Sequence, residues 1–332
     1  DLSLMGLIEI IPKIPMLISR IKLTANSIIS QNPDVLITID SPDFCMRVAK
    51  KVRNALPNLK IIHYVAPSVW AWRPERAAKM SKYVDHVLAL LPFEPPYMEA
   101  EGMTCDFVGH PAVSSPHVSK KAQEKFKKKY NLHNGPIITV LPGSRIGEIK
   151  RMCPIFNKVL NNIEKLYPDS QFILPVASSV EKDVVNAVKS WNVKPLLLLN
   201  EGKDLKELEH DKFITYSISS AALATSGTVS LELAAKKCPM IVAYKANWIT
   251  TKMVKKLAKI DTANLINIIT DTKVIPEHLF ENCTVENITE SLRSLLNNDN
   301  NQIKAMEETM NRLGASRKDI HLLAANSVLN NI

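Results

Sequence analysis

The sequence predicts an α/β protein built from two doubly wound domains that face one another across a cleft. Short apolar runs rich in β-branched residues alternate with segments of helical period through both halves of the chain. Such alternation indicates parallel strands joined by helical crossovers. A length of 332 residues provides for one large or two medium domains, and a polar, lysine-rich stretch at 112–135 lies between the two halves.

Composition narrows the class of protein. An apolar share of 46% with 23% charged residues is ordinary for a globular protein. The net charge of +9 favours an anionic partner, which could be nucleic acid, a phosphorylated small molecule or an acidic membrane surface. The five cysteines lie far apart and are odd in number, as is typical of reduced thiols in the cytosol. No apolar run reaches the roughly 18 residues that a membrane-spanning helix needs.

Carboxylates surround the first expected strand. In the first half, strands are expected at 35–39, 61–65, 87–91 and 106–108, and helices at 15–31, 45–54 and 74–82. Ligands of open α/β sheets bind at the carboxyl ends of strands, where Asp40 and Asp43 lie. Asp43 could equally cap the helix that follows. Asp34 lies at the opposite end of the strand, so its position favours a structural role.

Two further features of the first half could contact a ligand. Trp70 and Trp72 follow the second strand and could offer a flat wall, although burial of one of them is expected. His110 follows the last strand and is a candidate acid, base or phosphate contact, with local hydrogen bonding as an equal alternative.

Apolar side chains near the start could form a membrane-docking patch. The patch consists of Ile8, Ile10, Ile11, Ile14, Leu17 and Ile18. Pro12 and Pro15 exclude one continuous helix through this stretch, whereas Pro15 suits the first turn of a helix. From the sequence alone, packing of that helix on its own sheet is favoured over docking.

The stretch PIITVLPGSRIGEIKR at 136–151 organises the second half. Its β-branched run ends at a Pro-Gly-Ser-Arg turn that opens a helix, and such a turn presents backbone N–H groups to an anion. Helical spacing relates the apolar residues Ile149, Met152, Phe156, Val159, Leu160 and Ile163. Next to Gly143, Ser144 adds a hydroxyl and Arg145 a permanently charged planar donor. We therefore expect a phosphate or diphosphate site, with an ordinary βα turn as the alternative.

A second turn of small residues, Ser226-Gly227-Thr228, opens another helix and offers similar donors. Glu232 lies one helical turn beyond Thr228, from where its carboxylate could reach paired sugar hydroxyls. Other strands are expected at 172–176, 195–199, 221–224 and 239–243, the last ending at Lys245. Helices are expected at 180–191 and 214–220, and the remainder after Lys245 is expected to be helical, including 303–312 and 318–329.

Several motifs are missing from the sequence. It contains no G-x-G-x-x-G and no G-x-x-x-x-G-K-[ST], which argues against nicotinamide cofactors and P-loop hydrolysis. It also contains no H-E-x-x-H, no Cys/His cluster for zinc and no D-x-D pair for a metal-bound diphosphate. A nucleotide diphosphate would therefore have to be neutralised by Arg, Lys and helix N-termini.

With these turns placed, the chain resembles the lipid-A-disaccharide synthases, which are GT-B glycosyltransferases of Gram-negative bacteria with two Rossmann-like domains. The matching stretches are LMGLIEII, PDVLITIDSPDF, HYVAPSVWAWRPERAAKM, LALLPFE, FVGHP, LPGSRIGEI, SGTVSLELAAKKCPMIVAYK and NLIN. VAPSVWAWR, LPGSR and SGTVSLE in this order are very specific. The last two alone would fit other UDP-sugar enzymes of the GT-B fold, which stay an alternative.

The resemblance implies an inverting transfer in lipid A biosynthesis. UDP-2,3-diacylglucosamine would be the donor, and the 6-hydroxyl of 2,3-diacylglucosamine 1-phosphate (lipid X) the acceptor. The products would be the tetraacylated disaccharide 1-phosphate and UDP, and no metal or organic cofactor is expected. Because both substrates are diacylated, a cytoplasmic protein that associates peripherally with the inner membrane is expected. A homodimer is plausible, and nucleic acid is not an expected partner because no nucleic-acid motif is present.

The resemblance also assigns residues. Asp43 matches the critical carboxylate of the family and would be the base, Asp34 a second important aspartate, and Asn267 an important asparagine. Arg145 would stabilise the departing UDP. The expected substrate and UDP contacts are Gly143, Ser144, Arg145, Ser226, Gly227, Thr228, Glu232, Lys245 and His110.

We expect residues 1–130 to form an acceptor and membrane-side domain, and 131–310 a UDP-sugar domain. Residues 311–332 would contain a helix that packs back on the first domain. The chain opens on DLSLMGLIEI without a starting Met, whereas the family begins earlier, with a strand, a glycine-rich loop and a helix. We therefore expect a fragment whose first domain is incomplete, and a truncated UDP-binding module without activity is an alternative.

Overall fold

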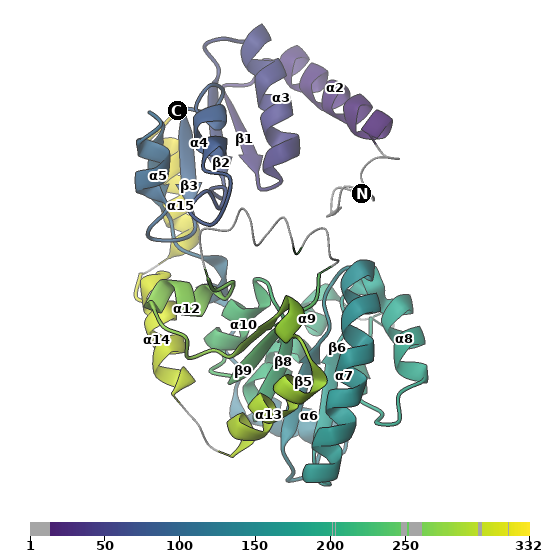
Figure 1. The fold of residues 1–332 in the computed structure, drawn as a ribbon. Coiled ribbons are helices and arrows are strands. Elements are labelled where there is room, and N and C mark those ends of the chain that lie inside the picture. Colours follow the sequence, from purple (N-terminus) through teal and green to yellow (C-terminus); the bar gives the residue numbers. More distant parts are fainter. Residues whose placement is uncertain are drawn as a thin grey trace. The chain divides into compact units, whose positions relative to one another are not determined.

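The structure, a computed structural model, describes residues 14–200, 202, 204–246, 251, 261–297, 301–317 and 319–332 (Figure 1). The described residues form two compact units. Unit 1 consists of those in 14–111 and 316–332, and unit 2 of those in 112–315. All strand pairs of the described residues are parallel, which confirms the predicted α/β fold class.

Unit 1 is built on a four-stranded sheet in the order β1-β2-β3-β4. Its strands are β1 (Val35–Ile39), β2 (Lys60–Tyr64), β3 (His86–Ala89) and β4 (Thr104–Phe107). Its helices are α2 (Ile14–Gln31), α3 (Pro42–Ala55), α4 (Glu75–Met80), α5 (Pro95–Glu99) and α15 (Ile320–Leu329). Helix α3 packs on one face of the sheet and α2 packs on α3, because their buried residues form one core with those of β2 and β3. This layering follows from apolar stripes on helices and strands that must be buried together.

The opposite face of this sheet is covered by α15, which returns from the end of the chain (yellow in Figure 1). Apolar side chains of β2 and β3 pack there against Ala324 and Val328. A polar cluster adds to the contact: Ser327 Oγ lies 2.9 Å from His86 Nε2 and donates to Asp106 Oδ2 at 2.6 Å. Burial lowers the pKa of His86, so the cluster holds a neutral imidazole at neutral pH.

Unit 2 is built on a six-stranded sheet in the order β10-β9-β8-β5-β6-β7. Its strands are β5 (Ile137–Leu141), β6 (Gln171–Pro175), β7 (Leu196–Leu198), β8 (Ala221–Thr225), β9 (Met240–Tyr244) and β10 (Glu277–Leu279). Its helices are α6 (Lys120–Lys129), α7 (Ile146–Leu166), α8 (Glu181–Lys189), α9 (Leu205–Ile218), α10 (Val229–Ala235), α12 (Leu265–Thr270), α13 (Val285–Leu296) and α14 (Gln302–Arg312). Short 3-10 turns lie at Pro111–Ser114, Ser178–Val180 and Phe280–Asn282.

Helices cover both faces of the second sheet. On one face, α7, α8 and α13 contribute to a single large core, and the apolar residues of α7 expected at helical spacing are all buried in it. On the other face, Phe126 of α6 and Ile214 of α9 pack against β5, β6 and β7. The lysines of α6 are exposed to solvent and Phe126 is buried, so the helix is amphipathic.

Two expectations about elements of unit 2 were wrong. The segment after Lys245, expected to be helical, contains β10, which pairs in parallel with β9 through Glu277↔Val242. A three-residue strand is too short to show a period in the sequence. Helix α9 begins at Leu205, nine residues before the expected start at 214, because Asp204 caps it by accepting from Lys206 N.

All five cysteines are buried and unpaired, which confirms the expectation of reduced thiols. Burial raises the pKa of each thiol; the shift is to about 12 for Cys105 and Cys153. Their side chains therefore act as small apolar core residues and not as thiolate nucleophiles.

The buried His63 of β2 predicts an acid-dependent loss of stability. Its Nδ1 lies 2.8 Å from Thr38 Oγ1 of β1, and burial lowers its pKa from 6.5 to about 4. The folded state therefore binds this proton less tightly than the unfolded state. The contribution of His63 is fully present above pH 6.5 and is lost as pH falls from 6.5 to 4, by up to about 3 kcal/mol.

Urea unfolding followed by tryptophan fluorescence at pH 7 and pH 4.5 measures this loss. Replacement His63→Gln removes the titration, so the variant should lose less stability than the unchanged chain over the same interval. An equal loss in both proteins would contradict the assignment.

Candidate functional site

The two turns predicted to bind phosphate follow adjacent strands of the sheet in unit 2. Strands β5 and β8 pair in parallel, with Leu141 opposite Ala224, and they lie side by side in Figure 1. Because parallel neighbours end at the same edge, residues 142–145 and 226–228 emerge together at the carboxyl edge of the sheet. Segments far apart in the sequence thus supply donors to one place.

A carboxylate of the chain already contacts the first turn. Ser144 N donates to Glu148 Oε2 at 3.0 Å, and Arg145 Nη1 donates to Glu148 Oε1 at 2.8 Å. Glu148 is buried in the first turn of α7, where a negative charge is favoured by the helix N-terminus. Gly143 has a φ of +120°, which favours glycine. The turn therefore has the geometry and charge to hold an anionic oxygen, and the Arg145 side chain stays 41% exposed.

The second turn leads into the short helix α10. Thr228 is the N-cap residue, and its side chain makes no capping hydrogen bond. Four residues on, Glu232 forms an ion pair of 3.0 Å with Lys212 of α9. The hydroxyl of fully buried Tyr216 also interacts with Glu232. Burial, as the larger cause, and the negative charge of Glu232 raise the pKa of Tyr216 well above its usual value. The carboxylate of Glu232 is therefore held near the turn by its ion pair with Lys212.

Two other expected residues lie nearer to β9 and β10. Lys245 is exposed directly after β9, and its carbonyl accepts from Arg151 Nε at 2.8 Å, which joins the strand end to α7. Asn267 is buried, and its amide accepts from Ile275 N at 3.0 Å and donates to Ile275 O at 3.0 Å and Glu277 Oε2 at 3.2 Å. Through these hydrogen bonds Asn267 stabilises the loop that precedes β10.

In unit 1, Asp43 lies in the first turn of α3, at the carboxyl end of β1. Ser41 occupies the N-cap position, so the alternative that Asp43 caps this helix is wrong. The Asp43 side chain is 82% exposed and accepts from Arg76 Nη2 at 2.9 Å. Asp40 and Ser41 both have left-handed φ values of 51° and 45°, a strained turn of the kind that gathers at functional sites. Asp34 is exposed before β1, at the opposite end of the strand.

The two tryptophans after β2 have different environments. Trp70 Nε1 donates to Glu94 Oε1 at 3.2 Å, and its ring meets Phe93 edge to face at 5.1 Å. Glu94 is buried, which raises its pKa to about 7, and it also accepts from Leu91 N. Trp70 is half-buried and Trp72 is exposed, so the expected burial of one tryptophan is met only in part.

His110 follows β4 and Gly109. Burial lowers the pKa of His110 to about 4, so the ring is neutral at neutral pH. A neutral imidazole can exchange hydrogen bonds with a ligand, but it brings no positive charge to a phosphate.

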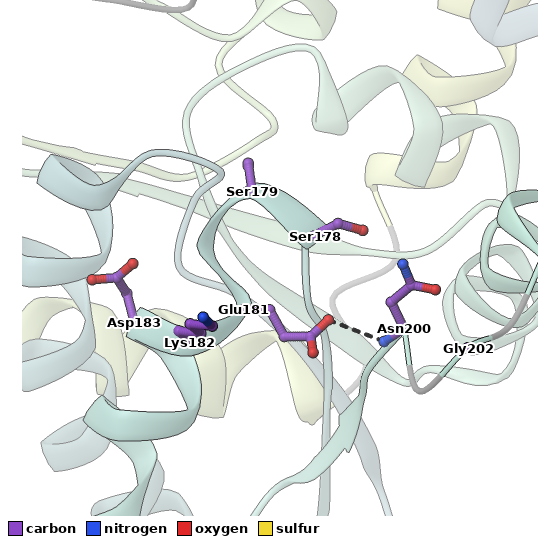
Figure 2. Close-up of a pocket in the computed structure, with 7 residues that line it drawn as sticks. All are labelled: Ser178, Ser179, Glu181, Lys182, Asp183, Asn200 and Gly202. Carbon is purple, nitrogen blue, oxygen red and sulfur yellow. Dashed lines mark hydrogen bonds between the residues drawn. The ribbon is translucent and has the colours of Figure 1, made fainter. Parts of the chain in front are cut away.

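Sequence reasoning missed a polar hollow of about 480 Å³ at the ends of β6 and β7. Its lining residues are Ser178, Ser179, Glu181, Lys182, Asp183, Asn200 and Gly202 (Figure 2). In Figure 2 the Glu181 side chain points to the backbone of Asn200, whose N–H it accepts at 3.1 Å. Ser179 Oγ donates to Ser144 O at 3.1 Å, which attaches the hollow to the first turn. Polar residues after two strand ends were the only signal available in the sequence.

The remaining expectations concern membranes and metals. In the described ranges, no helix is long and apolar enough to cross a membrane. Of the expected docking patch, Ile14 and Ile18 are exposed by 42% and 57% on α2 and Leu17 is half-buried. Ile8, Ile10 and Ile11 lie outside the described residues. No group of three or more His, Cys, Asp or Glu among the described residues could hold a metal ion.

Glycine is required at one of the two turns and not at the other. A Cβ added at Gly143 would lie 2.5 Å from Glu148 Oε2 and 2.6 Å from Glu148 Cβ, on a left-handed backbone. Gly143→Ala should therefore cost on the order of 2 kcal/mol of stability or more. A Cβ at Gly227 meets nothing within 4 Å, so Gly227→Ala should change stability by less than about 1 kcal/mol. Urea unfolding of both variants tests the pair, and equal losses would contradict the geometry of the first turn.

Solved structures resemble the fold at low sequence identity. The UDP-GlcNAc 2-epimerase from Neisseria meningitidis bound to UDP-GlcNAc matches with a TM-score of 0.62 and 13% identity, over 95% of this chain and 81% of that chain. A glycosyltransferase from Rickettsia africae matches with a TM-score of 0.53 and 15% identity, over 95% of this chain and 80% of that chain. At such identity the likeness concerns the fold alone, and it supports the expected GT-B architecture of two Rossmann-like units.

Sequence relatives carry the assignment further. The lipid-A-disaccharide synthase of Ruegeria pomeroyi is 45% identical over 332 residues, which are 100% of this chain and 82% of that protein. The protein of the same name from Rhodospirillum centenum is 39% identical over 334 residues, 99% of this chain and 81% of that protein. The family model described as lipid-A-disaccharide synthetase matches residues 1–330. The chain therefore belongs to the lipid-A-disaccharide synthetase family.

Proposed function

We propose that the chain joins UDP-2,3-diacylglucosamine to 2,3-diacylglucosamine 1-phosphate, lipid X, and releases UDP, as a step of lipid A biosynthesis. Membership of the family supports the activity. The observation that carries the mechanism is the pair of turns at one edge of the unit 2 sheet, on β5 and β8. They offer a diphosphate backbone donors, hydroxyls and Arg145.

The chemistry is an inverting displacement. The 6-hydroxyl oxygen of the acceptor attacks the anomeric carbon of the donor sugar, and the bond from that carbon to the β-phosphate oxygen breaks. The hydroxyl proton passes to the Asp43 carboxylate, which acts as general base. The exposure of Asp43 supports this role, since a substrate can reach it, and the bond from Arg76 orients the carboxylate. Asp34 lies directly before β1, at the end of the strand opposite Asp43. We therefore infer a structural role for Asp34 at that end.

Departing UDP gains negative charge, which fixed donors stabilise. Arg145 is the main donor, helped by Ser144 and by the turn of Ser226 to Thr228. In this role the Arg145 guanidinium shares its donors between Glu148 and the diphosphate. Glu232 would receive the ribose hydroxyls, with Lys212 holding its carboxylate in place.

The diacylated substrates require contact with a membrane surface. The exposed Ile14 and Ile18, with exposed Lys22 on the same helix, support peripheral docking of α2 on the cytoplasmic leaflet of the inner membrane. Homodimerisation stays a prediction of the family resemblance.

Removal of Arg145 should slow the transfer. Arg145→Ala should cost on the order of 3 kcal/mol of transition-state stabilisation, roughly a hundredfold in kcat/KM, because the departing charge loses its permanent donor. Lys150 is exposed on α7, the helix that begins directly after Arg145. Lys150→Ala is therefore the matched control and should retain activity. Near-normal UDP release by the Arg145 variant would rule out the role.

Removal of the base should separate chemistry from binding. Asp43→Asn should abolish turnover and leave UDP affinity unchanged, because the amide cannot take the proton. Glu99→Gln, an exposed carboxylate on α5, controls for the loss of a charge in unit 1. Retained turnover in the Asp43 variant would exclude this residue as base.

Titration of the unchanged chain with UDP, beside an assay for disaccharide, distinguishes the alternatives. UDP binding without product would support a UDP-binding module without activity. Product from another UDP-sugar only would support a different enzyme of the GT-B fold.

A further inference from the structure

The connection after β2 presents a partly exposed indole ring with two guanidinium groups over it. Trp72 is 36% exposed. Arg73 Cζ lies 4.4 Å from the centroid of the Trp72 ring, and Arg76 Cζ lies 5.2 Å from it. The indole therefore supports two guanidinium groups, which together form a positively charged surface.

The backbone of this connection is strained. Arg73 has a φ of 50° and Val65, at the start of the connection, a φ of 84°. A non-glycine residue in the left-handed region costs roughly 1–3 kcal/mol, and a β-branched one is a pronounced outlier. The partly buried hydrogen bond from Trp70 to Glu94 anchors the connection to the residues after β3. Strain of this kind is kept where it places a side chain for a purpose.

The charges around Trp72 do not cancel. Arg76 donates to Asp43 at 2.9 Å and is balanced by it. Arg73 forms no ion pair with any carboxylate in the described part of the chain. One full positive charge therefore remains beside the exposed ring, at the edge of the sheet where the proposed base lies. The phosphate group of a sugar phosphate offers an anion to this surface.

We propose that Arg73 and Arg76, whose guanidinium groups lie over the Trp72 ring, bind the phosphate of the sugar acceptor. The inference rests on the proposed function and adds a binding site that the family motifs do not assign. Planar guanidinium groups bind phosphate oxygens in pairs of parallel hydrogen bonds, which fixes orientation as well as affinity. Because Arg76 also contacts Asp43, a phosphate bound there is linked to the carboxylate that takes the acceptor proton.

The test measures what the phosphate contributes to binding. The chain is titrated, in detergent micelles, with 2,3-diacylglucosamine 1-phosphate and with 2,3-diacylglucosamine that lacks the phosphate. The variant is Arg73→Asn, because asparagine tolerates the left-handed backbone and the substitution should not disturb folding. Lys82→Ala, which removes an exposed positive charge beyond α4, is the control.

For the unchanged chain and the control, the phosphorylated acceptor should bind more tightly by roughly tenfold or more, as charge-assisted bonds provide. Arg73→Asn should remove most of that difference and leave the affinity for UDP and for the unphosphorylated sugar unchanged. An Arg73 variant that keeps the full difference, or weakens both sugars equally, would overturn the proposal. The binding measurement does not require turnover. A chain without transferase activity would therefore count against the proposed function, whereas the comparison of the two acceptors would still decide whether Arg73 binds the phosphate.

Discussion

The parallel pairing of β5 with β8 is the constraint on which the rest of unit 2 depends. Adjacent parallel strands end at one edge, so the turns that follow them share a small volume whatever their separation in the sequence. Each turn leads into a helix, and the first N–H groups of a helix lack partners within it. The sheet therefore concentrates hydrogen-bond donors at one edge. Such donors suit the phosphate groups of the UDP-sugar that the family uses.

Ion pairs within the chain keep this edge electrostatically balanced. Glu148 accepts from Ser144 N and from Arg145, and Lys212 pairs with Glu232. Half-buried charges without partners would be costly, so these pairs hold the side chains in place. The close approach of Glu148 to Gly143 shows that the turn is built around a carboxylate. A diphosphate bound there, as proposed, would meet a guanidinium that Glu148 already orients.

Much of the fold could be predicted from the sequence, because it depends on local patterns. The apolar spacing of α7 and the small-residue turns after β5 and β8 are visible in short windows. The pairing of Arg76 with Asp43 is not, since it joins residues of different elements. Asn267 shows the same limit: the family resemblance assigned it a functional role, but its hydrogen bonds with Ile275 could not be predicted from the sequence. Very short elements such as β10 leave no period to detect.

The two units use the same principle for different chemistry. In unit 1 the carboxyl ends of β1 and β2 carry Asp43 and the strained connection to Trp72. In unit 2 the corresponding ends carry the two turns that are proposed to bind phosphate. In the proposed reaction Asp43 would act where the acceptor binds, and Arg145 would act where the leaving group forms.

Hydrogen exchange of the backbone amides, measured with UDP and with uridine, tests the central claim most directly. The account predicts that UDP slows exchange at both 143–146 and 226–229, and that uridine, which lacks the diphosphate, does not. Protection of one turn without the other, or equal protection by uridine, would contradict the claim that the two turns bind one diphosphate.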